Sequence, residues 1–273
     1  MPSSRLHVRR SIALSALLLC CHLGQAVAVE KPAGFIWVSD SLTSPNQPVT
    51  IDAVLTAGGD RNGTVSGEPL ELVVDGKAAA TVATGADGRA QFRYTPTSRG
   101  NKSVTVRTGD QARISASATA TVASWERRTP LLIVEVAAIR ADQTGPEPSS
   151  DAAEELGKLT QFYYNVIYVE VDTGGGDRLR TTDRTRRWLS EHKFPSGHVL
   201  TLSSGEGVLG GKIDELRAAG WTTLKIGVGR TRPFAEAFLQ RRLDVVLVPE
   251  PAKGEVPRKA RVAKDWKDVR KKL

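Results

Sequence analysis

The sequence predicts two folded domains, an all-β sandwich followed by an α/β domain with a doubly wound parallel sheet. The chain of 273 residues is long enough for two hydrophobic cores. From residue 35 to 123, short runs with alternating apolar residues are separated by turn signals, which is typical of a sandwich. From residue 129 to 251, apolar runs alternate with segments of helical character, which indicates a parallel sheet with crossover helices.

The first 28 residues have the pattern of a secretory signal peptide. Three arginines, the last of them Arg10, precede an apolar run from Ile12 to Leu19, and Ala26-Val27-Ala28 follows it. An uncleaved anchor is the alternative, but the run is shorter than the ~20 residues that a membrane span needs. We therefore expect an exported protein, periplasmic or secreted, cleaved near Ala28.

Both cysteines of the chain, Cys20 and Cys21, lie inside this segment. The bulky Leu19 before Cys20 does not resemble the small residue of lipoprotein cleavage sites. The chain after the segment therefore has no disulfide and no thiolate metal site, which fits a bacterial periplasm.

Charge and composition are those of a soluble globular protein, with 40% hydrophobic and 25% charged residues and a net charge of +8. Much of the positive excess lies in the tail, residues 252–273. Such a cluster can bind anionic membranes or nucleic acid, but an exported location excludes nucleic acid as a partner. The spacing of Val262, Trp266, Val269 and Leu273 predicts either a packed terminal helix or a surface-seeking amphipathic one.

The sandwich is predicted from apolar alternation in residues 49–55, 70–74 and 104–106. Asp75-Gly76 and Asp87-Gly88 predict hairpin turns between strands. The spacing of the strands suggests a sandwich of the immunoglobulin type. The segment from Thr84 to Tyr94 also resembles the "T-x-x-D-G-x-A-x-F-x-Y" hairpin of bacterial Ig-like domains, a resemblance that implies a fold and no function.

The α/β domain opens with Leu131–Ile139, a short apolar run with β-branched residues that predicts a fully buried parallel strand. Further strands are expected at residues 165–171, 198–202, 223–228 and 244–249, with helices at 151–159, near 185–189, at 212–220 and at 233–241. Asp151 and Glu154 are spaced as a capping pair for the first of these helices. In such sheets the functional residues lie at the carboxyl ends of the strands.

Three stretches of this domain resemble the haloacid dehalogenase (HAD) superfamily, and within it the lipin-like phosphatidate-phosphatase branch. The loop after Tyr168 and the segment Thr185-Arg-Arg-Trp188-Leu189 are similar to "Y-x-T-A-R … T-R-x-W-L". Pro195-Ser-Gly197-His-Val-Leu200 is similar to "P-x-G-x-L-L", and the segment from Gly229 to Phe238 to "G-N-R-P-T-D-x-x-A-Y". The matches cover Leu131 to Pro251 in the same order.

The resemblance implies a site that has lost its catalytic groups. The nucleophilic aspartate aligns with Glu135, the acid/base aspartate with Ala137, and the motif threonine with Ile139. The second-strand threonine aligns with Glu170, and the Mg²⁺-binding aspartate of the last loop aligns with Phe234. Among these positions, only the lysine of the family is retained, as Lys212. Because ~1 Å of misplacement can cost ~100-fold in rate, we expect a non-catalytic pseudo-phosphatase without a metal or cofactor. Mg²⁺ would be required only under the alternative hypothesis, in which the protein is an altered phosphatase with Glu135 as its nucleophile.

Basic residues and glycines at the same sheet edge suggest a ligand-binding rim. Lys212, Arg230 and Arg232 are expected to converge there, and Gly174, Gly175 and Gly176 could offer backbone N–H groups. The resemblance makes an anionic ligand or phosphatidic acid a candidate. The alternative is that these arginines only solvate the rim.

Other kinds of chemistry find little support in the sequence. Glu135 and Glu170 end neighbouring strands and could face each other as an acid/base pair or a cation site, unless Lys212 or an arginine pairs with them. His192 and His198 lack a third ligand for zinc. We therefore expect a binding or scaffolding module. The two alternatives are the Mg²⁺-dependent phosphatase and a structural protein of the envelope that packs against another envelope protein.

Overall fold

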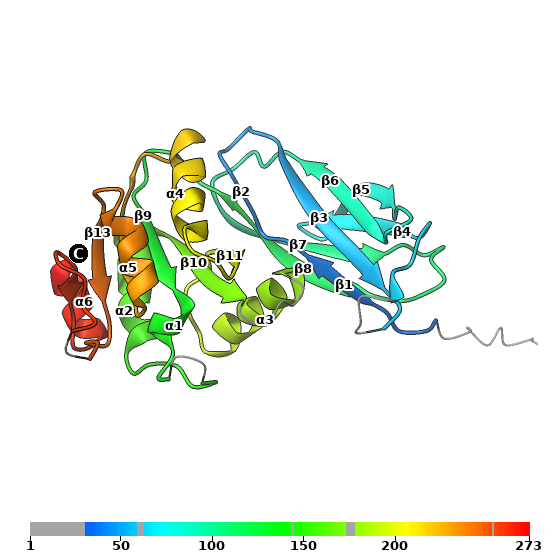
Figure 1. Ribbon diagram of the computed structural model, residues 1–273. Coiled ribbons are helices and arrows are strands. Elements are labelled where there is room, and N and C mark those ends of the chain that lie inside the picture. Colours follow the sequence, from blue (N-terminus) through cyan, green and yellow to red (C-terminus); the bar gives the residue numbers. More distant parts are fainter. Residues whose placement is uncertain (1–30, 59–62, 143–144, 173–177, 253) are drawn as a thin grey trace, which may run out of the picture. The chain divides into compact units, whose positions relative to one another are not determined.

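The structure is a computed structural model that describes residues 31–58, 63–142, 145–172, 178–252 and 254–273. Residues 31–273 form one compact unit (Figure 1), so the domain boundaries predicted within it stay predictions. The predicted signal peptide and Gly174–Gly176 lie outside the described residues. In the described part of the chain, no helix is long and apolar enough to cross a membrane.

The amino-terminal half forms two β-sheets that enclose one hydrophobic core. One sheet has three strands in the order β1-β3-β6, and the other has five in the order β2-β8-β7-β4-β5. Ile51, Phe92 and Val104 are fully buried between them. The strands are β1 Phe35–Val38, β2 Ser41–Thr43, β3 Val49–Thr56, β4 Pro69–Val74, β5 Lys77–Ala83, β6 Arg89–Tyr94, β7 Gly100–Thr108 and β8 Ser117–Ser124.

One of the two predicted hairpin turns is present. Asp75 and Gly76 join β4 to β5 with φ angles of 49° and 77°, the left-handed conformation that two-residue hairpin turns require. The prediction for Asp87-Gly88 was wrong, because β5 and β6 belong to different sheets and do not pair. That turn instead carries the chain from one layer of the sandwich to the other.

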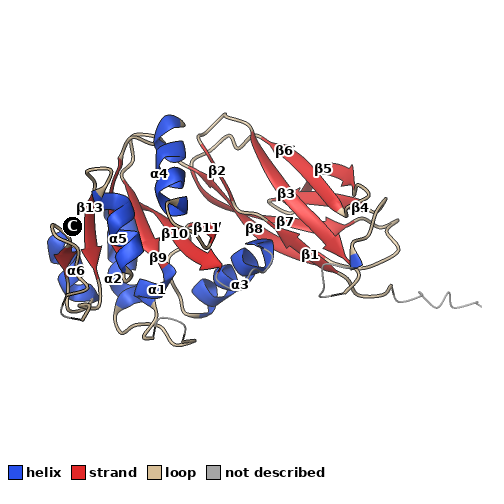
Figure 2. Cartoon of the chain, in the orientation of Figure 1, coloured by secondary structure: helices blue, strands red, loops and turns tan. Residues whose placement is uncertain are grey.

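The carboxyl-terminal half is a six-stranded, all-parallel sheet in the order β11-β10-β9-β12-β13-β14. This is the strand order 3-2-1-4-5-6 of a doubly wound sheet, whose switch point lies between β9 and β12. Figure 2 shows the alternation of strands and helices. The elements are β9 Leu131–Glu135, α1 Val136–Ile139, α2 Ala152–Phe162, β10 Asn165–Asp172, α3 Arg178–Glu191, β11 His198–Ser203, α4 Val208–Ala218, β12 Leu224–Gly229, α5 Arg232–Leu239, β13 Asp244–Leu247, β14 Arg261–Val262 and α6 Trp266–Lys272.

The opening strand is shorter than predicted. β9 ends at Glu135, and residues 136–139 form the one-turn helix α1, so the prediction of a strand up to Ile139 was wrong. Alternation cannot reveal this turn, because Val136, Ala138 and Ile139 are as buried as the strand itself. Asp151 lies at the predicted N-cap position of α2, but its side chain makes no capping hydrogen bond and pairs with Lys267 at 2.9 Å.

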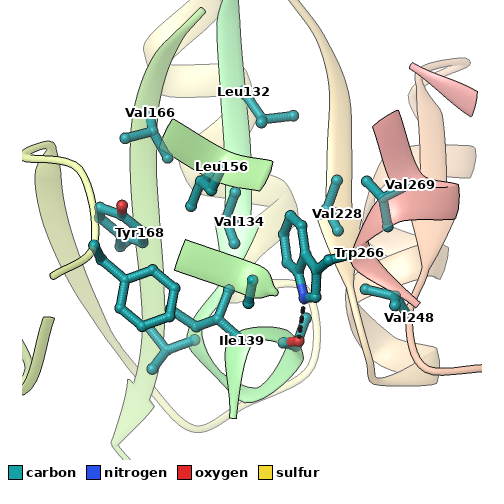
Figure 3. Close-up of a cluster of buried hydrophobic side chains, with 14 of the residues drawn as sticks. Leu132, Val134, Ile139, Leu156, Val166, Tyr168, Val228, Val248, Trp266 and Val269 are labelled. Carbon is teal, nitrogen blue, oxygen red and sulfur yellow. Dashed lines mark hydrogen bonds between the residues drawn. The ribbon is translucent and has the colours of Figure 1, made fainter. Parts of the chain in front are cut away.

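Helices cover both faces of this sheet. One face packs against α1, α2, α3 and α6 in a hydrophobic cluster that includes Leu156, Trp188 and Trp266. Figure 3 shows much of this cluster, with Leu156 and Trp266 labelled. The other face packs against α4 and α5 (Figure 1). The hydrophobic cluster on this face also contains Trp125, which directly follows β8.

The carboxyl-terminal helix is packed. Trp266 and Val269 are fully buried, and Trp266 donates a hydrogen bond from Nε1 to the Ala138 carbonyl at 3.1 Å (Figure 3). Several basic residues of the tail form ion pairs, among them Arg270 with Glu155 at 2.9 Å. Of the two predicted alternatives, the packed helix is the one that forms.

Helix α3 links the sandwich to the parallel sheet. The Asp40 side chain, which is fully buried, pairs with Arg186 of α3 at 2.7 Å. Asp40 also accepts backbone hydrogen bonds from Thr121 at 2.8 Å and from Val199 at 3.0 Å. Arg186 in turn donates to the carbonyl groups of Val38 and Thr119. A buried charge with this many partners fixes the helix to the sandwich.

Candidate functional site

A cavity of about 1440 Å³ lies at the carboxyl ends of β9, β10 and β11 and reaches α5 beyond β12. This is the edge at which ligands bind in open α/β sheets. Glu135 and Glu170 both line it, as do residues from the first turns of α3 and α4. The volume exceeds that of most small-molecule sites, which hold roughly 300–1,000 Å³. The cavity is therefore large enough for a sizeable ligand.

Glu135 lies at the carboxyl end of β9, at the switch point of the sheet. Its Oε2 accepts hydrogen bonds from the backbone N–H groups of Arg230 at 2.6 Å and Thr231 at 2.9 Å, and its Oε1 accepts one from the Thr231 hydroxyl at 2.6 Å. Thr231 is also the N-cap of α5, since its side chain accepts a hydrogen bond from the Phe234 N–H. The carboxyl group thus occupies the N-terminus of α5, where an anionic ligand would otherwise be favoured.

Burial raises the pKa of Glu135, although the hydrogen bonds from Thr231 and Arg230 act in the opposite direction. Only 6% of the residue is exposed. A nucleophilic carboxylate needs a free oxygen that can approach phosphorus. Both oxygens of Glu135 are already engaged with the β12–α5 loop, so this side chain holds the loop rather than facing a reactant.

Glu170 is engaged by an arginine, as one of the sequence alternatives expected. Its Oε2 lies 3.3 Å from Nη2 of Arg140, and the Thr185 hydroxyl donates to the same oxygen at 3.4 Å. Arg140 also lies over the Trp188 ring, 5.0 Å from the centroid. Burial raises the pKa of Glu170, and the charge of Arg140 lowers it. Glu170 and Arg140 together form one wall of the cavity.

The residues at this edge do not fit the Mg²⁺ ion that the HAD resemblance implies. A magnesium site needs several free oxygen ligands in near-octahedral geometry. Position 137 carries an alanine, Glu135 is bonded to the α5 N-terminus, and Glu170 is paired with an arginine. Among the described residues, no three His, Cys, Asp or Glu side chains are grouped as metal ligands. We derive no chemical step through a metal.

Phe234, which aligns with a metal-binding aspartate, belongs to the core. It is 2% exposed and stacks on Phe238, with ring centroids 4.9 Å apart. Gly227 and Gly229 are glycines because a Cβ atom at either position would overlap the Phe238 or Phe234 ring. The glycine pattern of β12 therefore serves the packing of α5 on the sheet.

The predicted basic rim is not brought together at the cavity. Among the described residues that line it, Lys212, Arg230 and Arg232 are absent. Lys212 pairs with Glu215 at 2.8 Å, and Arg232 pairs with Glu236 at 2.7 Å. Arg230 donates its guanidinium N–H groups to the carbonyls of Ala137, Arg140 and Ala141, which cap α1 and the loop after it. A binding role for these three residues stays a prediction.

Four other arginines line the cavity instead, namely Arg140, Arg180, Arg184 and Arg241. Sequence reasoning passed over all four. A signal was present in α3, where Arg180 and Arg184 are four residues apart and so share one face of a helix. The position of Arg140 could not be found, because it depends on the unexpected turn of α1.

Comparisons with known proteins give distant matches among solved structures. Neither a comparison with protein-family models nor one with curated proteins found a match. Among solved structures, the chain resembles D,D-heptose 1,7-bisphosphate phosphatase from Burkholderia thailandensis with 15% identity and a TM-score of 0.40, over 53% of this chain and 97% of that one. It also resembles the D00-D0 domain of intimin with 15% identity and a TM-score of 0.28, over 37% of this chain and 52% of that one.

A third match is the PKD domain of an M14-like peptidase from a Thermoplasmatales archaeon, with 16% identity and a TM-score of 0.26, over 35% of this chain and 99% of that one. All three likenesses have TM-scores of 0.40 or less and identities of 15–16%, so they assign no family to this chain. The architecture of the chain is defined by its sheet topology.

Proposed function

We propose that this protein is an exported, non-catalytic binding module whose α/β half uses the cavity at the carboxyl edge of the sheet to hold an anionic ligand. The observation that carries the proposal is the engagement of Glu135. Its carboxyl group occupies the N-terminus of α5, with its oxygens held by Arg230 and Thr231. The residue at the position of the nucleophile is therefore engaged in hydrogen bonds within the protein.

The surrounding residues support the absence of phosphoryl transfer. Ala137 has no group that can transfer a proton. Arg140 forms an ion pair with Glu170. Phosphoryl transfer requires a positioned nucleophile and stabilisation of the charge on the equatorial oxygens. A binding role needs only the cavity and cations on its wall, and both are present. Export follows from the signal-peptide pattern alone and is part of the proposal.

An enzymatic assay tests the first half of the proposal. Purified protein is incubated with p-nitrophenyl phosphate and Mg²⁺, beside Glu135→Gln as a matched variant. We expect no turnover above the reagent blank for either protein. Turnover by the wild type that Glu135→Gln abolishes would establish the alternative, an altered phosphatase.

A binding assay tests the second half. The protein is titrated calorimetrically with phenyl phosphate and, separately, floated with vesicles that do or do not contain phosphatidic acid. Ser204→Trp, an exposed change on the cavity wall, should weaken binding, whereas Ser190→Trp on the outer side of α3 should not. Binding of neither probe would favour a purely structural envelope protein instead.

A further inference from the structure

The contact between the sandwich and the parallel sheet contains a buried histidine that the candidate site does not use. His198 is the first residue of β11, the strand at one edge of the sheet, and only 8% of it is exposed. Its Nδ1 atom is shielded from water and has no hydrogen-bond partner in the described part of the chain. Buried polar atoms nearly always have a partner, so this environment is unfavourable for a charged imidazole ring.

The residue that follows His198 is bonded directly to the sandwich. The backbone N–H of Val199 donates to one oxygen of the Asp40 carboxylate at 3.0 Å, and the N–H of Thr121 on β8 donates to the other at 2.8 Å. Arg186 of α3 pairs with the same carboxylate at 2.7 Å. His198 is therefore one residue away from the group that joins β11 and α3 to the sandwich.

The charged groups that act on the His198 ring come from three segments of the chain. Asp40 lies between β1 and β2, Arg186 on α3 and Lys212 on α4. Burial lowers the pKa of His198; the charge of Asp40 opposes this, and the charges of Lys212 and Arg186 add to it. The residue that pairs with His198 on β10 is Ile167, and β8 has no titratable side chain. The ring is therefore held in its neutral form.

Further polar atoms at this contact also lack partners. Arg180 of α3 lies over the Trp37 ring of β1, 5.0 Å from the centroid. Nε and Nη2 of Arg180 and Nε1 of Trp37 are shielded from water and make no hydrogen bond among the described residues. If the contact opened, water would bond to these atoms, which recovers part of the free energy that opening requires. The contact therefore opens more easily than one of equal area whose polar atoms are all paired.

We propose that the contact between the sandwich and the parallel sheet is acid-sensitive, and that His198 is the group that takes up a proton when the contact opens. In the closed contact the ring stays neutral, as its burial requires. When β11 separates from the sandwich, water reaches the ring, and His198 regains the ordinary histidine pKa of about 6.5. Acid then favours the opened form, because that form binds one more proton than the closed form. The inference does not depend on a ligand in the cavity.

The expected pH dependence has a definite sign and size. Below about pH 6.5 the equilibrium constant for opening should rise by up to about tenfold for each pH unit, until the closed form also takes up the proton. Well above that pH neither form is protonated, and the dependence should disappear. Burial raises the pKa of Glu135 and of Glu170, and their effect on stability has the opposite sign. A variant at position 198 isolates the histidine.

Amide hydrogen exchange between about pH 5.5 and 8, corrected for the intrinsic pH dependence of exchange, tests the proposal. The N–H groups of Val199 and Thr121 report on the contact, because both donate to Asp40. Their protection should fall by up to about tenfold from pH 6.5 to 5.5, whereas the amides of β4 and β12 should keep theirs. In His198→Gln, which cannot ionise, the protection of the same two amides should not depend on pH.

His192→Gln is the matched control, since His192 is the other histidine that follows the predicted signal peptide. This variant should respond to pH as the wild type does. The proposal is wrong if acid leaves the two amides protected in the wild type, or if His198→Gln keeps the wild-type pH dependence. An equal loss of protection in β4 and β12 would also overturn it, since acid would then act on the whole fold. If His198→Gln does not fold, NMR titration of the wild type with isotope-labelled histidine replaces it, and a His198 pKa of about 6.5 or higher contradicts the proposal.

Discussion

Helix α3 carries the same residue type in two settings that differ in almost every respect. Arg186 is surrounded by partners from the sandwich, namely Asp40 and the carbonyls of Val38 and Thr119. Arg180, less than two turns earlier, stacks on Trp37, and its buried Nε and Nη2 have no hydrogen-bond partner among the described residues. A fully partnered arginine is a structural element, whereas Arg180 is positioned, among the described residues, by its stacking on Trp37. The comparison shows that the role of a charged residue on a helix depends on its contacts rather than on the number of charges that the helix carries.

The largest effect should come from removing the structural arginine. Arg186→Ala leaves the fully buried Asp40 carboxylate without its cation, so the free energy of unfolding should fall by about 3–5 kcal/mol. Urea unfolding followed by circular dichroism measures this. Arg187→Ala, which breaks an exposed pair with Asp183, should cost about 1 kcal/mol or less. Equal losses in the two variants would contradict the distinction between the settings.

A smaller, pH-dependent effect should come from Glu135. Because burial raises its pKa in the folded protein, the folded state holds the proton more tightly than the unfolded chain does. Stability should therefore fall as the pH rises from the ordinary glutamate pKa of about 4.3 through the raised value, and stay lower above it. Glu135→Gln cannot ionise, so it should gain stability relative to the wild type across that window. A pH-independent difference between the two proteins would show that folding does not raise this pKa.

The smallest effect on stability should come from Arg184. Since it has no partner among the described residues, Arg184→Ala should change the free energy of unfolding by no more than about 0.5 kcal/mol. This small change is the opposite of the large loss of stability expected for Arg186→Ala. A destabilisation as large as that of Arg186→Ala would mean that Arg184 is structural too.

The sequence predicted the strands better than the turns between them. The strands that begin at Leu131, Asn165 and His198 were expected from their β-branched and apolar content, and they form. The turn of α1 was missed because its residues are buried on every side, so no alternation marks the end of β9. The two-residue strand β14 is too short for any pattern, and it exists because β13 offers an open edge.

The candidate site was predicted only in part, for a related reason. Glu135 and Glu170 were found because they end strands, and a strand end has a fixed place in a parallel sheet. The arginines depend on where helices and loops place long side chains. Lys212 was expected to begin a helix, but α4 starts four residues earlier at Val208, and Lys212 pairs with Glu215 within it.

The packing of the carboxyl-terminal helix also affects the order in which the molecule can fold. Ribosomes release residues 31–260 before β14 and α6 exist, so the core between β9 and α2 lacks Trp266 and Val269 during that time. The edge of β13 is likewise open until Arg261 and Val262 pair with it. An unpaired strand edge beside an incomplete core invites contact with other chains. The parallel sheet therefore lacks its edge strand β14, and its core lacks the α6 side chains, until the last of the described residues are synthesised.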